Sequence, residues 1–324
     1  MAQNLWNVTK SRQNLPAFGN TLFQNQQRLN SRSLISSSLH LFSTNQKQRH
    51  LCSQTISIAH RGSSSVFPGN SIEAFLEADR IGAEMIELDI AVCKSGEIIV
   101  HHDPYLPDGT LLRNAGKDQI KEFFPNIATF KEVLNVLKKS SVRLYLDMKG
   151  QNIVEPTLRL LHDKISNQNW DAKRFLVATF NQYDLLKVAA YKEKHSLLKK
   201  IETIVIIDAV PFGYAKSLQD LHIDYISVGG GCIIPEFVED ARKRGIRMMA
   251  WTVNNINMMK YFMGLGVYGI CTDYPEMVAE VRSKLQADDV HSNAGKEFSG
   301  ATNTDFIDPR AYFQFLHNDA QFSL

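Results

Sequence analysis

Short apolar runs alternate with amphipathic segments from residue 57 onward, and this alternation restricts the possible fold more than any other feature of the chain. Nine runs have the length and apolar content of buried strands, at residues 57–61, 85–91, 97–102, 143–148, 175–180, 203–207, 224–228, 247–253 and 269–272. Segments with helical periodicity lie between most of them, at residues 70–81, 129–139, 152–165, 182–195, 236–244 and 256–263. Strands that alternate with helices in this way form a parallel sheet.

The second and third runs are too close together to be parallel neighbours. Only about four residues, 93–96, separate them, whereas a parallel crossover needs about a dozen or more. We therefore expect an antiparallel hairpin, in which the run 97–102 folds back over the barrel and returns His102 to the level of Glu87 and Asp89. The eight remaining runs predict an α/β fold, a (β/α)8 TIM barrel with this hairpin as an excursion after its second strand.

Local signals indicate several helix ends and one long loop. Asn70 is a candidate N-cap of the first helix, with Glu73 three residues later in capping-box order. Gly245 and Gly264 are candidate C-terminal stops. Residues 104–128 have little periodicity and contain several Pro and Gly, so we expect a loop over the mouth of the active site.

Residues 1–54 differ in composition from the rest of the chain. They contain six basic residues and no acidic one, because the first acidic residue is Glu73. They are also rich in Ser, Asn and Gln and lack a continuous apolar core, which is typical of a mitochondrial transit peptide and not of a secretory signal. We expect cleavage between Arg32 and Cys52. A disordered tail without a targeting role is the alternative, and the protein would then be cytoplasmic.

The remaining chain predicts one catalytic barrel, residues 55–284, followed by a polar tail, residues 285–324. Without the six basic residues of the leader, 30 basic residues stand against 34 acidic ones, a net charge of −4 that gives no support for nucleic-acid binding. No apolar run approaches the roughly 18 residues of a transmembrane helix, and the four cysteines have neither disulfide nor zinc spacing. Peripheral membrane contact and the oligomeric state stay open.

Two carboxylates alternate at the end of the second run. Side chains of a strand point to opposite faces in turn, so Glu87 and Asp89 point together, with Leu88 opposite. Converging carboxylates repel each other, and a bound divalent cation is the usual remedy. Ion pairing with Arg61 and Lys149 is the alternative.

Two histidines and an arginine also follow apolar runs, at the strand ends where a TIM barrel has its active site. Arg61 could bind a phosphate, while His60 and His102 could transfer protons, because the ordinary pKa of histidine is near 6.5. Together with the carboxylates they predict metal-assisted chemistry on a phosphate ester. His101 must face away from His102, so we expect it to pack against the protein or to face solvent.

An ordered set of motifs between about residues 57 and 283 resembles the glycerophosphodiester phosphodiesterase family, which has a TIM barrel of the phospholipase C type. The motifs are His60-Arg61-Gly62, Pro68-Gly69-Asn70-Ser71, Glu87-Leu88-Asp89, His102-Asp103, Asp147-Met148-Lys149, Trp251-Thr252-Val253-Asn254 and the segment 266–275. Two positions depart from the family pattern: Gly69 replaces the usual Glu, and Asp147 stands where many members have Glu.

The resemblance implies an enzyme that hydrolyses glycerophosphodiesters to sn-glycerol 3-phosphate and an alcohol. It implies that Glu87, Asp89 and Asp147 bind one divalent cation, Mg²⁺ or Ca²⁺, since all the ligands are oxygens. His60 and His102 would transfer protons while the glycerol hydroxyl attacks phosphorus to give a cyclic phosphate, which water then opens. Because Asp147 is one methylene shorter than Glu, water could bridge it to the metal and the metal preference could change.

Further residues are candidates for binding the substrate. Arg61 and Lys149 would hold the phosphate and offset the charge that builds up on its oxygens. Asn70 would fix the first loop or contact the phosphate, and Trp251 would either form an apolar wall against the glycerol or pack in the barrel core. Asp273 is expected to cap or anchor a loop, without a role as a ligand.

The substrate itself has alternatives. Related branches of the family act on lipids, either as lysophospholipase D or as a phosphatidylglycerol phospholipase C, and the latter also tends towards Asp-x-Lys, as in Asp147-Met148-Lys149. An apolar rim on residues 104–128 would favour a lipid substrate. A barrel that binds phosphodiesters without hydrolysing them is the remote alternative. The head group, the acyl requirement and the choice between Mg²⁺ and Ca²⁺ are not determined by the sequence.

Overall fold

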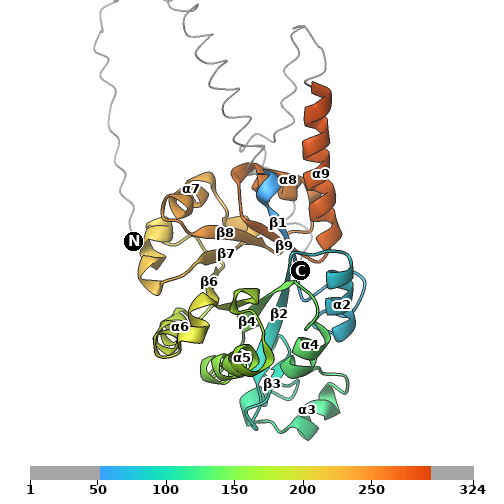
Figure 1. The fold of residues 1–324 in the computed structure, drawn as a ribbon, viewed down its shortest axis with the longest axis vertical. Helices are drawn as coiled ribbons and strands as arrows, with labels where there is room; N and C mark the ends of the chain where they lie inside the picture. The colour runs from blue at the N-terminus through green and yellow to red at the C-terminus, as the bar shows by residue number, and fades with distance from the viewer. Residues whose placement is uncertain (1–51, 293–324) are drawn as a thin grey trace, which may run out of the picture. The chain divides into compact units, whose positions relative to one another are not determined.

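A computed structural model describes residues 52–292 of the protein, and its side chains as far as residue 285. Within this range, nine strands form one sheet: β1 Ile56–Ala59, β2 Met85–Val92, β3 Ile98–Val100, β4 Arg143–Met148, β5 Phe175–Thr179, β6 Glu202–Ile207, β7 Tyr225–Gly229, β8 Arg247–Trp251 and β9 Gly269–Thr272. All except β3 run parallel, and β1 pairs with both β2 and β9, which closes the barrel (Figure 1). The predicted (β/α)8 TIM barrel is confirmed.

The third strand is the predicted antiparallel excursion. β3 pairs with β2 in a register that places Val100 opposite Ile90. The backbone N–H of His101 donates to the carbonyl oxygen of Asp89 at 3.1 Å. The hairpin therefore returns the chain to the level of the carboxylates, as its short connection requires.

Helices follow most of the barrel strands. They are α2 Ile72–Arg80, α3 Lys117–Phe123, α4 Phe130–Val136, α5 Val154–Gln168, α6 Gln182–Lys194, α7 Pro235–Lys243, α8 Ile256–Leu265 and α9 Pro275–Ser292. Short 3₁₀ segments complete the described chain: η1 Leu112–Asn114, η2 Ala172–Arg174, η3 Ser196–Lys200, η4 Tyr214–Leu221 and η5 Gly230–Cys232. The crossover from β6 to β7 contains η4, for which the sequence pattern predicted no helix.

Two predicted helix ends were wrong. The N-cap of α2 is Ser71, whose side chain accepts a hydrogen bond from the N–H of Ala74, whereas Asn70 has a left-handed backbone (φ 64°) and turns its side chain towards Asp89. Gly264 lies inside α8, which ends at Gly266 in the left-handed conformation that favours glycine.

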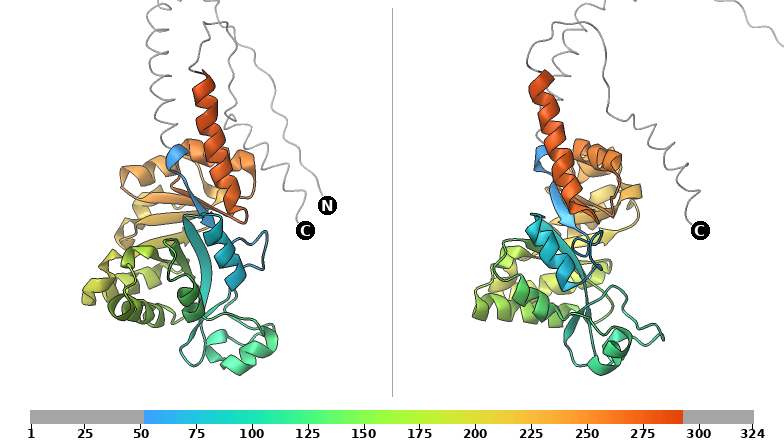
Figure 2. Two further views of the ribbon diagram at one scale, coloured as in Figure 1. Left: turned by 45° about the vertical axis from the view of Figure 1, so that its right-hand side comes forward. Right: turned by 90° about the vertical axis from the view of Figure 1, so that its right-hand side faces the viewer.

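The segment 104–128 is more ordered than the predicted loop. It contains η1 and α3, whose apolar side chains Leu112 and Ile120 pack with Ile99 of the hairpin in a small separate core. Figure 2 shows α3 beside the hairpin, at the end of the molecule away from α9. Because apolar contacts fix this segment to β3, it forms a wall over one side of the barrel mouth.

The C-terminal boundary of the barrel also differs from the prediction. α9 extends to Ser292, past the predicted boundary at residue 285. It follows β9 and lies against β1, where the guanidinium of Arg282 donates to the carbonyl oxygen of Thr55 at 2.9 Å. The predicted leader up to residue 51 and the predicted tail from residue 293 lie outside the described residues.

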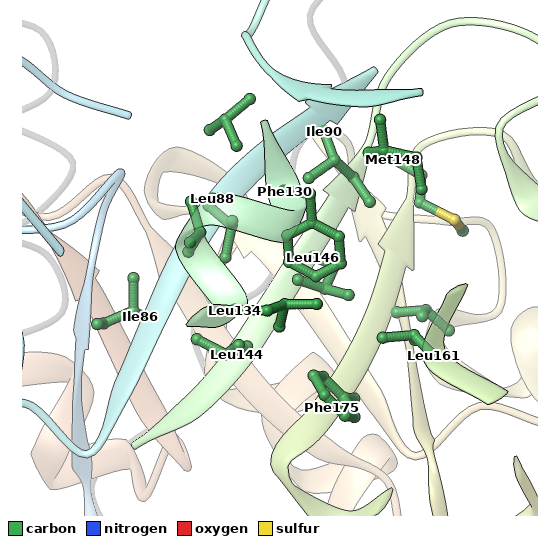
Figure 3. Close-up of a cluster of buried hydrophobic side chains, with 14 of the residues drawn as sticks. Ile86, Leu88, Ile90, Phe130, Leu134, Leu144, Leu146, Met148, Leu161 and Phe175 are labelled. Carbon is green, nitrogen blue, oxygen red and sulfur yellow. The ribbon is translucent and has the colours of Figure 1, made fainter. Parts of the chain in front are cut away.

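Strand alternation sorts the buried side chains into two layers. Ile86, Leu88 and Ile90 face outward and pack with Phe130 and Leu134 of α4 (Figure 3). The residues between them face into the barrel, whose apolar filling includes Ile58, Met85, Tyr145, Leu176, Ile204, Tyr225, Met249 and Cys271. Glu87 and Asp89 share this inward face, which explains how a fully buried strand can carry two acids within three consecutive residues. No described helix is long and apolar enough to cross a membrane.

Candidate active site

Three buried carboxylates meet at the carboxyl ends of β2 and β4. Glu87, Asp89 and Asp147 are 5%, 1% and 6% exposed, and one oxygen from each lies within 4.8 Å of the other two. The parallel register of β2 and β4 places Asp89 directly beside Asp147. The structure thus brings together all three predicted metal ligands.

Burial makes this cluster electrostatically unfavourable without a cation. Desolvation, followed by repulsion from Asp89 and Asp147, raises the pKa of Glu87 well above its ordinary value. Desolvation likewise raises the pKa of Asp147 to about 6, against the opposing effect of Lys149. The Nζ of Lys149 lies 2.6 Å from Oδ2 of Asp147 and 3.2 Å from Oδ1 of Asp89, so one ammonium group faces two carboxylates.

The donor set fits a hard divalent cation. The Oδ1 atom of Asp147 is buried and has no hydrogen-bond partner among the residues that the structure describes. An unpaired buried carboxylate oxygen is unfavourable, and a cation shared with Glu87 and Asp89 would satisfy it. Oxygen donors of this kind are preferred by Mg²⁺ and Ca²⁺.

The loop after β1 is fixed to the carboxylates. The backbone N–H of Arg61 donates to Oε2 of Glu87 at 2.9 Å. The Nδ2 of Asn70 donates to Oδ2 of Asp89 at 2.8 Å, and the N–H of Asp89 donates to Oδ1 of Asn70 at 3.2 Å. Of the two roles predicted for Asn70, these contacts support fixing the loop. Gly62 makes the turn possible, because a Cβ at this position would lie 2.6 Å from the carbonyl carbon of Ala74.

The guanidinium of Arg61 stands beside the carboxylates and remains partly open to solvent. Its Nε lies 3.1 Å from Oδ2 of Asp89, an ion pair without the geometry of a directed hydrogen bond. The side chain is 32% exposed. Arg61 therefore has donors left for a phosphate oxygen.

His60 is held by a carboxylate that the sequence reasoning assigned only to loop anchoring. Its Nδ1 lies 2.7 Å from Oδ1 of Asp273. The hydrogen bond from His60 is the main cause that lowers the pKa of Asp273 to about 2. Asp273 is thus ionised at neutral pH, and Nδ1 of His60 must be the protonated nitrogen that donates to it.

Asp273 also anchors its surroundings, as predicted. Ser64 donates to its Oδ1 at 2.8 Å, and Asn254 donates to its Oδ2 at 2.6 Å. A signal for the contact with His60 was available in the sequence: closure of the barrel pairs β1 with β9, and the register of Ala59 with Thr272 makes the next residues neighbours.

The two adjacent histidines diverge, as strand geometry predicted. His101 packs on the ring of Phe124 with a centroid distance of 4.3 Å, and desolvation lowers its pKa. His102 lies at the site mouth, 46% exposed, with its Nδ1 2.8 Å from Oδ1 of Asp103. The only described carboxylate that contacts the His102 ring is therefore Asp103.

An aromatic pair lines the site on the side of β5 and β8. Trp251 faces inward at the end of β8, and its ring meets Phe180 edge to face with a centroid distance of 5.7 Å. Phe180 also lies under Lys149, whose Nζ is 5.3 Å from the ring centroid. Trp251 thus borders both the barrel core and the site, and the sequence reasoning did not identify Phe180.

Sequence comparison with known proteins identifies a family whose model matches the barrel residues. A sequence model of the Glycerophosphoryl diester phosphodiesterase family matches residues 60–123 and 108–277. A glycerophosphodiester phosphodiesterase of Caldanaerobacter subterraneus is 27% identical over 247 residues, which cover 71% of this chain and 99% of the relative. Glycerophosphodiester phosphodiesterase 1 of Mus musculus is 23% identical over 243 residues, 63% of this chain and 73% of the relative.

Solved structures agree with the barrel. An Oleispira antarctica phosphodiesterase, solved in complex with the product sn-glycerol-3-phosphate, superposes with a TM-score of 0.60 at 23% identity, over 70% of this chain and 96% of that one. A glycerophosphodiester phosphodiesterase of Parabacteroides distasonis superposes with a TM-score of 0.61 at 24% identity, over 73% and 98% of the two chains. At this level of identity the likeness concerns the fold.

Proposed function

The chain belongs to the glycerophosphoryl diester phosphodiesterase family, and on that premise we propose that it hydrolyses glycerophosphodiesters to sn-glycerol 3-phosphate and an alcohol. The observation that carries the proposal is the meeting of three buried carboxylates with a carboxylate-bound histidine, His60, at the carboxyl ends of the barrel strands. Proton transfer beside a cation site is the chemistry that a phosphodiester requires.

His60 is the base in the first step. Because Asp273 fixes the proton on Nδ1, Nε2 is left to accept the proton of the glycerol hydroxyl. The hydroxyl oxygen then bonds to phosphorus, and the bond from phosphorus to the leaving alcohol breaks. His102 gives that alcohol its proton, and Asp103 stabilises the protonated imidazole. In the second step the roles reverse, and water opens the cyclic phosphate to glycerol 3-phosphate.

The phosphate is held by cations. Arg61 and Lys149 offset the charge on its oxygens, and Trp251 provides an apolar wall for the glycerol. Glu87, Asp89 and Asp147 would hold one Mg²⁺ or Ca²⁺, which when bound would polarise the phosphoryl group and neutralise the carboxylate cluster.

Phosphorus NMR spectroscopy tests the proposal directly. We expect glycerophosphocholine to give glycerol 3-phosphate with Mg²⁺ or Ca²⁺ and to remain intact with a chelator. A His60→Gln variant should lose turnover while still binding the substrate. If the wild type bound the diester and the metal without any turnover, the protein would be a binding barrel and the proposal would be wrong.

A lipid-directed activity, lysophospholipase D or phosphatidylglycerol phospholipase C, is the second candidate, and the surface around the site favours it. Large apolar side chains are exposed on segments that follow the carboxyl ends of several strands, the face that holds the active site. They are Val66 (62%), Tyr105 (50%), Phe180 (47%), Tyr183 (77%) and Phe212 (100%). Residues 104–128 also expose Leu111 and Phe123, so this segment has apolar side chains at its surface, as expected for a lipid substrate.

Vesicles separate the two candidates. Turnover of phosphatidylglycerol or lysophosphatidylcholine in vesicles, without turnover of glycerophosphocholine, would favour the lipid activity. Phe212→Ser should then weaken vesicle binding and leave hydrolysis of a soluble diester unchanged. If the wild type and Phe212→Ser bound vesicles equally, Phe212 would not be a membrane contact.

The mitochondrial address stays a prediction. The leader has the basic, acid-free composition of a transit peptide, and its described part begins only at residue 52. Import of the full chain into isolated mitochondria, followed by sequencing of the mature N-terminus, tests it. Retention of residues 1–54 on a cytoplasmic protein would contradict it.

A further inference from the structure

A pocket borders the carboxylate cluster on the side of the hairpin. It has a volume of about 210 Å³ and is lined by Ala91 and Val92 of β2, Pro104, residues 111–113 and residues 149–151. Pro104 lies two residues after His102, and Lys149 contacts Asp147 of the cluster. The pocket thus shares Lys149 with the carboxylate cluster, and its lining includes Pro104 of the segment that follows His102.

The pocket contains an unpaired positive charge. The Nε atom of Arg113 is buried and makes no hydrogen bond, and no carboxylate in the described part of the chain forms an ion pair with this guanidinium. The other cation of the lining, Lys149, is already paired with Asp147 and Asp89. A buried guanidinium donor without an acceptor is unfavourable, so a ligand with an anionic group would stabilise it.

Two acidic residues close in sequence to the pocket lining are engaged elsewhere. Asp103 contacts His102, and Asp108 accepts a hydrogen bond from the backbone N–H of Thr110. No carboxylate and no aromatic ring is among the lining residues. A cationic head group therefore finds neither a carboxylate nor an aromatic face in the lining, whereas an anionic group finds Arg113.

We propose that this pocket receives the leaving alcohol of the substrate and that Arg113 binds an anionic group on it, which makes a serine-type diester a better substrate than its ethanolamine counterpart. The inference rests on the proposed function, since it names the substrate class of the same site. The volume, about 210 Å³, is enough for a small head group, whose carboxylate would lie towards Arg113 of the lining.

Two matched substrates test the proposal. Glycerophosphoserine and glycerophosphoethanolamine differ by one carboxylate, and we expect the wild type to have the higher kcat/KM for the serine diester. Arg113→Gln should lower the ratio of the two kcat/KM values about tenfold, the effect of losing one charge-assisted hydrogen bond. Arg113→Lys, which keeps the charge, should restore part of the ratio.

Lys117→Gln is the control. It removes the same charge from the neighbouring helix α3, where Lys117 pairs with Glu97 at 3.1 Å and does not line the pocket. We expect its substrate ratio to equal that of the wild type. If wild type and Arg113→Gln gave the same ratio while both stayed folded by circular dichroism, the inference would be wrong.

Binding separates failure of the inference from failure of the proposed function. Calorimetry with glycerophosphoserine in a His60→Gln background should give weaker binding when Arg113 is also replaced by Gln. If neither diester were hydrolysed, the proposed function would fall, and this binding difference would still decide the role of Arg113. Identical binding with and without Arg113 would overturn the inference.

Discussion

His60 and Asp273 are 213 positions apart in the sequence, yet Nδ1 of the imidazole lies 2.7 Å from Oδ1 of the carboxylate. Each residue directly follows a barrel strand, β1 or β9, and the pairing of these two strands closes the barrel. Closure of the fold therefore assembles the proposed catalytic pair, because the first and last strands meet only when the barrel is complete.

Asp273→Asn should lower kcat by roughly 100-fold or more, since the amide can no longer fix the tautomer in which Nε2 of His60 accepts a proton. KM should change much less. Ser64→Ala, which removes one other hydrogen bond to the same carboxylate, is the control and should keep most of the activity. Steady-state kinetics on glycerophosphocholine measures both variants, and an unchanged kcat for Asp273→Asn would contradict the role of the pair.

The adjacent histidines provide a second matched pair. His102→Gln should abolish protonation of the leaving alcohol and lower kcat by about 100-fold or more. His101→Gln should keep most of the activity, because that ring packs on Phe124 and makes no hydrogen bond or ion pair with a carboxylate in the described part of the chain. Leaving alcohols of different acidity check the mechanism: a substrate with an acidic phenol as leaving group should lose much less rate in His102→Gln. If His102→Gln lost the same rate with both leaving groups, His102 would not be the acid that protonates the leaving alcohol.

Strand positions were predictable because their signals are local. Every predicted run coincides with an observed strand, and the short connection at residues 93–96 was enough to identify the hairpin. The predicted meeting of Glu87 and Asp89 needed only the alternation of a strand. The meeting of Asp147 with them was implied by the family resemblance, and the register of β4 with β2 shows it.

Features that depend on competing contacts were not predictable. Asn70 and Ser71 are both good caps, and only the bond from Asn70 to Asp89 leaves the cap to Ser71. The segment η4 has the three-residue period of a 3₁₀ helix, which a search for the α-helical period does not detect. The unpaired state of Arg113 follows from where the nearby acids point, which no sequence pattern encodes.

Asp147 links metal binding to stability. Its pKa in the metal-free fold is about 6 against an ordinary 3.8, so the folded protein binds the proton more tightly than the unfolded chain. Stability of the metal-free protein should therefore fall as pH rises from about 4 to 6 and stay lower above that, by about 3 kcal/mol at most. Asp147→Asn should recover part of this lost stability at pH 8 in chelator. Its stability advantage over the wild type should vanish below about pH 4.

Mg²⁺ or Ca²⁺ should make the wild type more stable than Asp147→Asn, the reverse of their order in chelator. The cation should raise the melting temperature of the wild type and have little effect on Asp147→Asn, because one of three ligands is missing. Asp184→Asn, which removes a buried carboxylate that pairs with Lys187 away from the site, should keep the full response to the metal. Thermal unfolding at pH 8 with and without the metal decides, and an equal metal response in Asp147→Asn would exclude Asp147 as a ligand.

The turn after His60 should tolerate no side chain at Gly62. Gly62 and Gly82 have nearly the same backbone angle, φ 83° and 81°, but a Cβ at Gly62 would lie 2.6 Å from backbone atoms of Ala74, whereas a Cβ at Gly82 would meet nothing within 4 Å. Gly82→Ala should therefore lower the free energy of unfolding by about 1 kcal/mol, the effect of the left-handed backbone alone. Gly62→Ala should lower the free energy of unfolding by roughly 3 kcal/mol or more and also lower kcat, because the shift moves Arg61 and His60.

Denaturant unfolding and kinetics on the Gly62→Ala and Gly82→Ala variants measure the difference. Equal destabilisation would mean that the turn can move away from α2. The position of His60 would then not depend on the close approach of Gly62 to that helix.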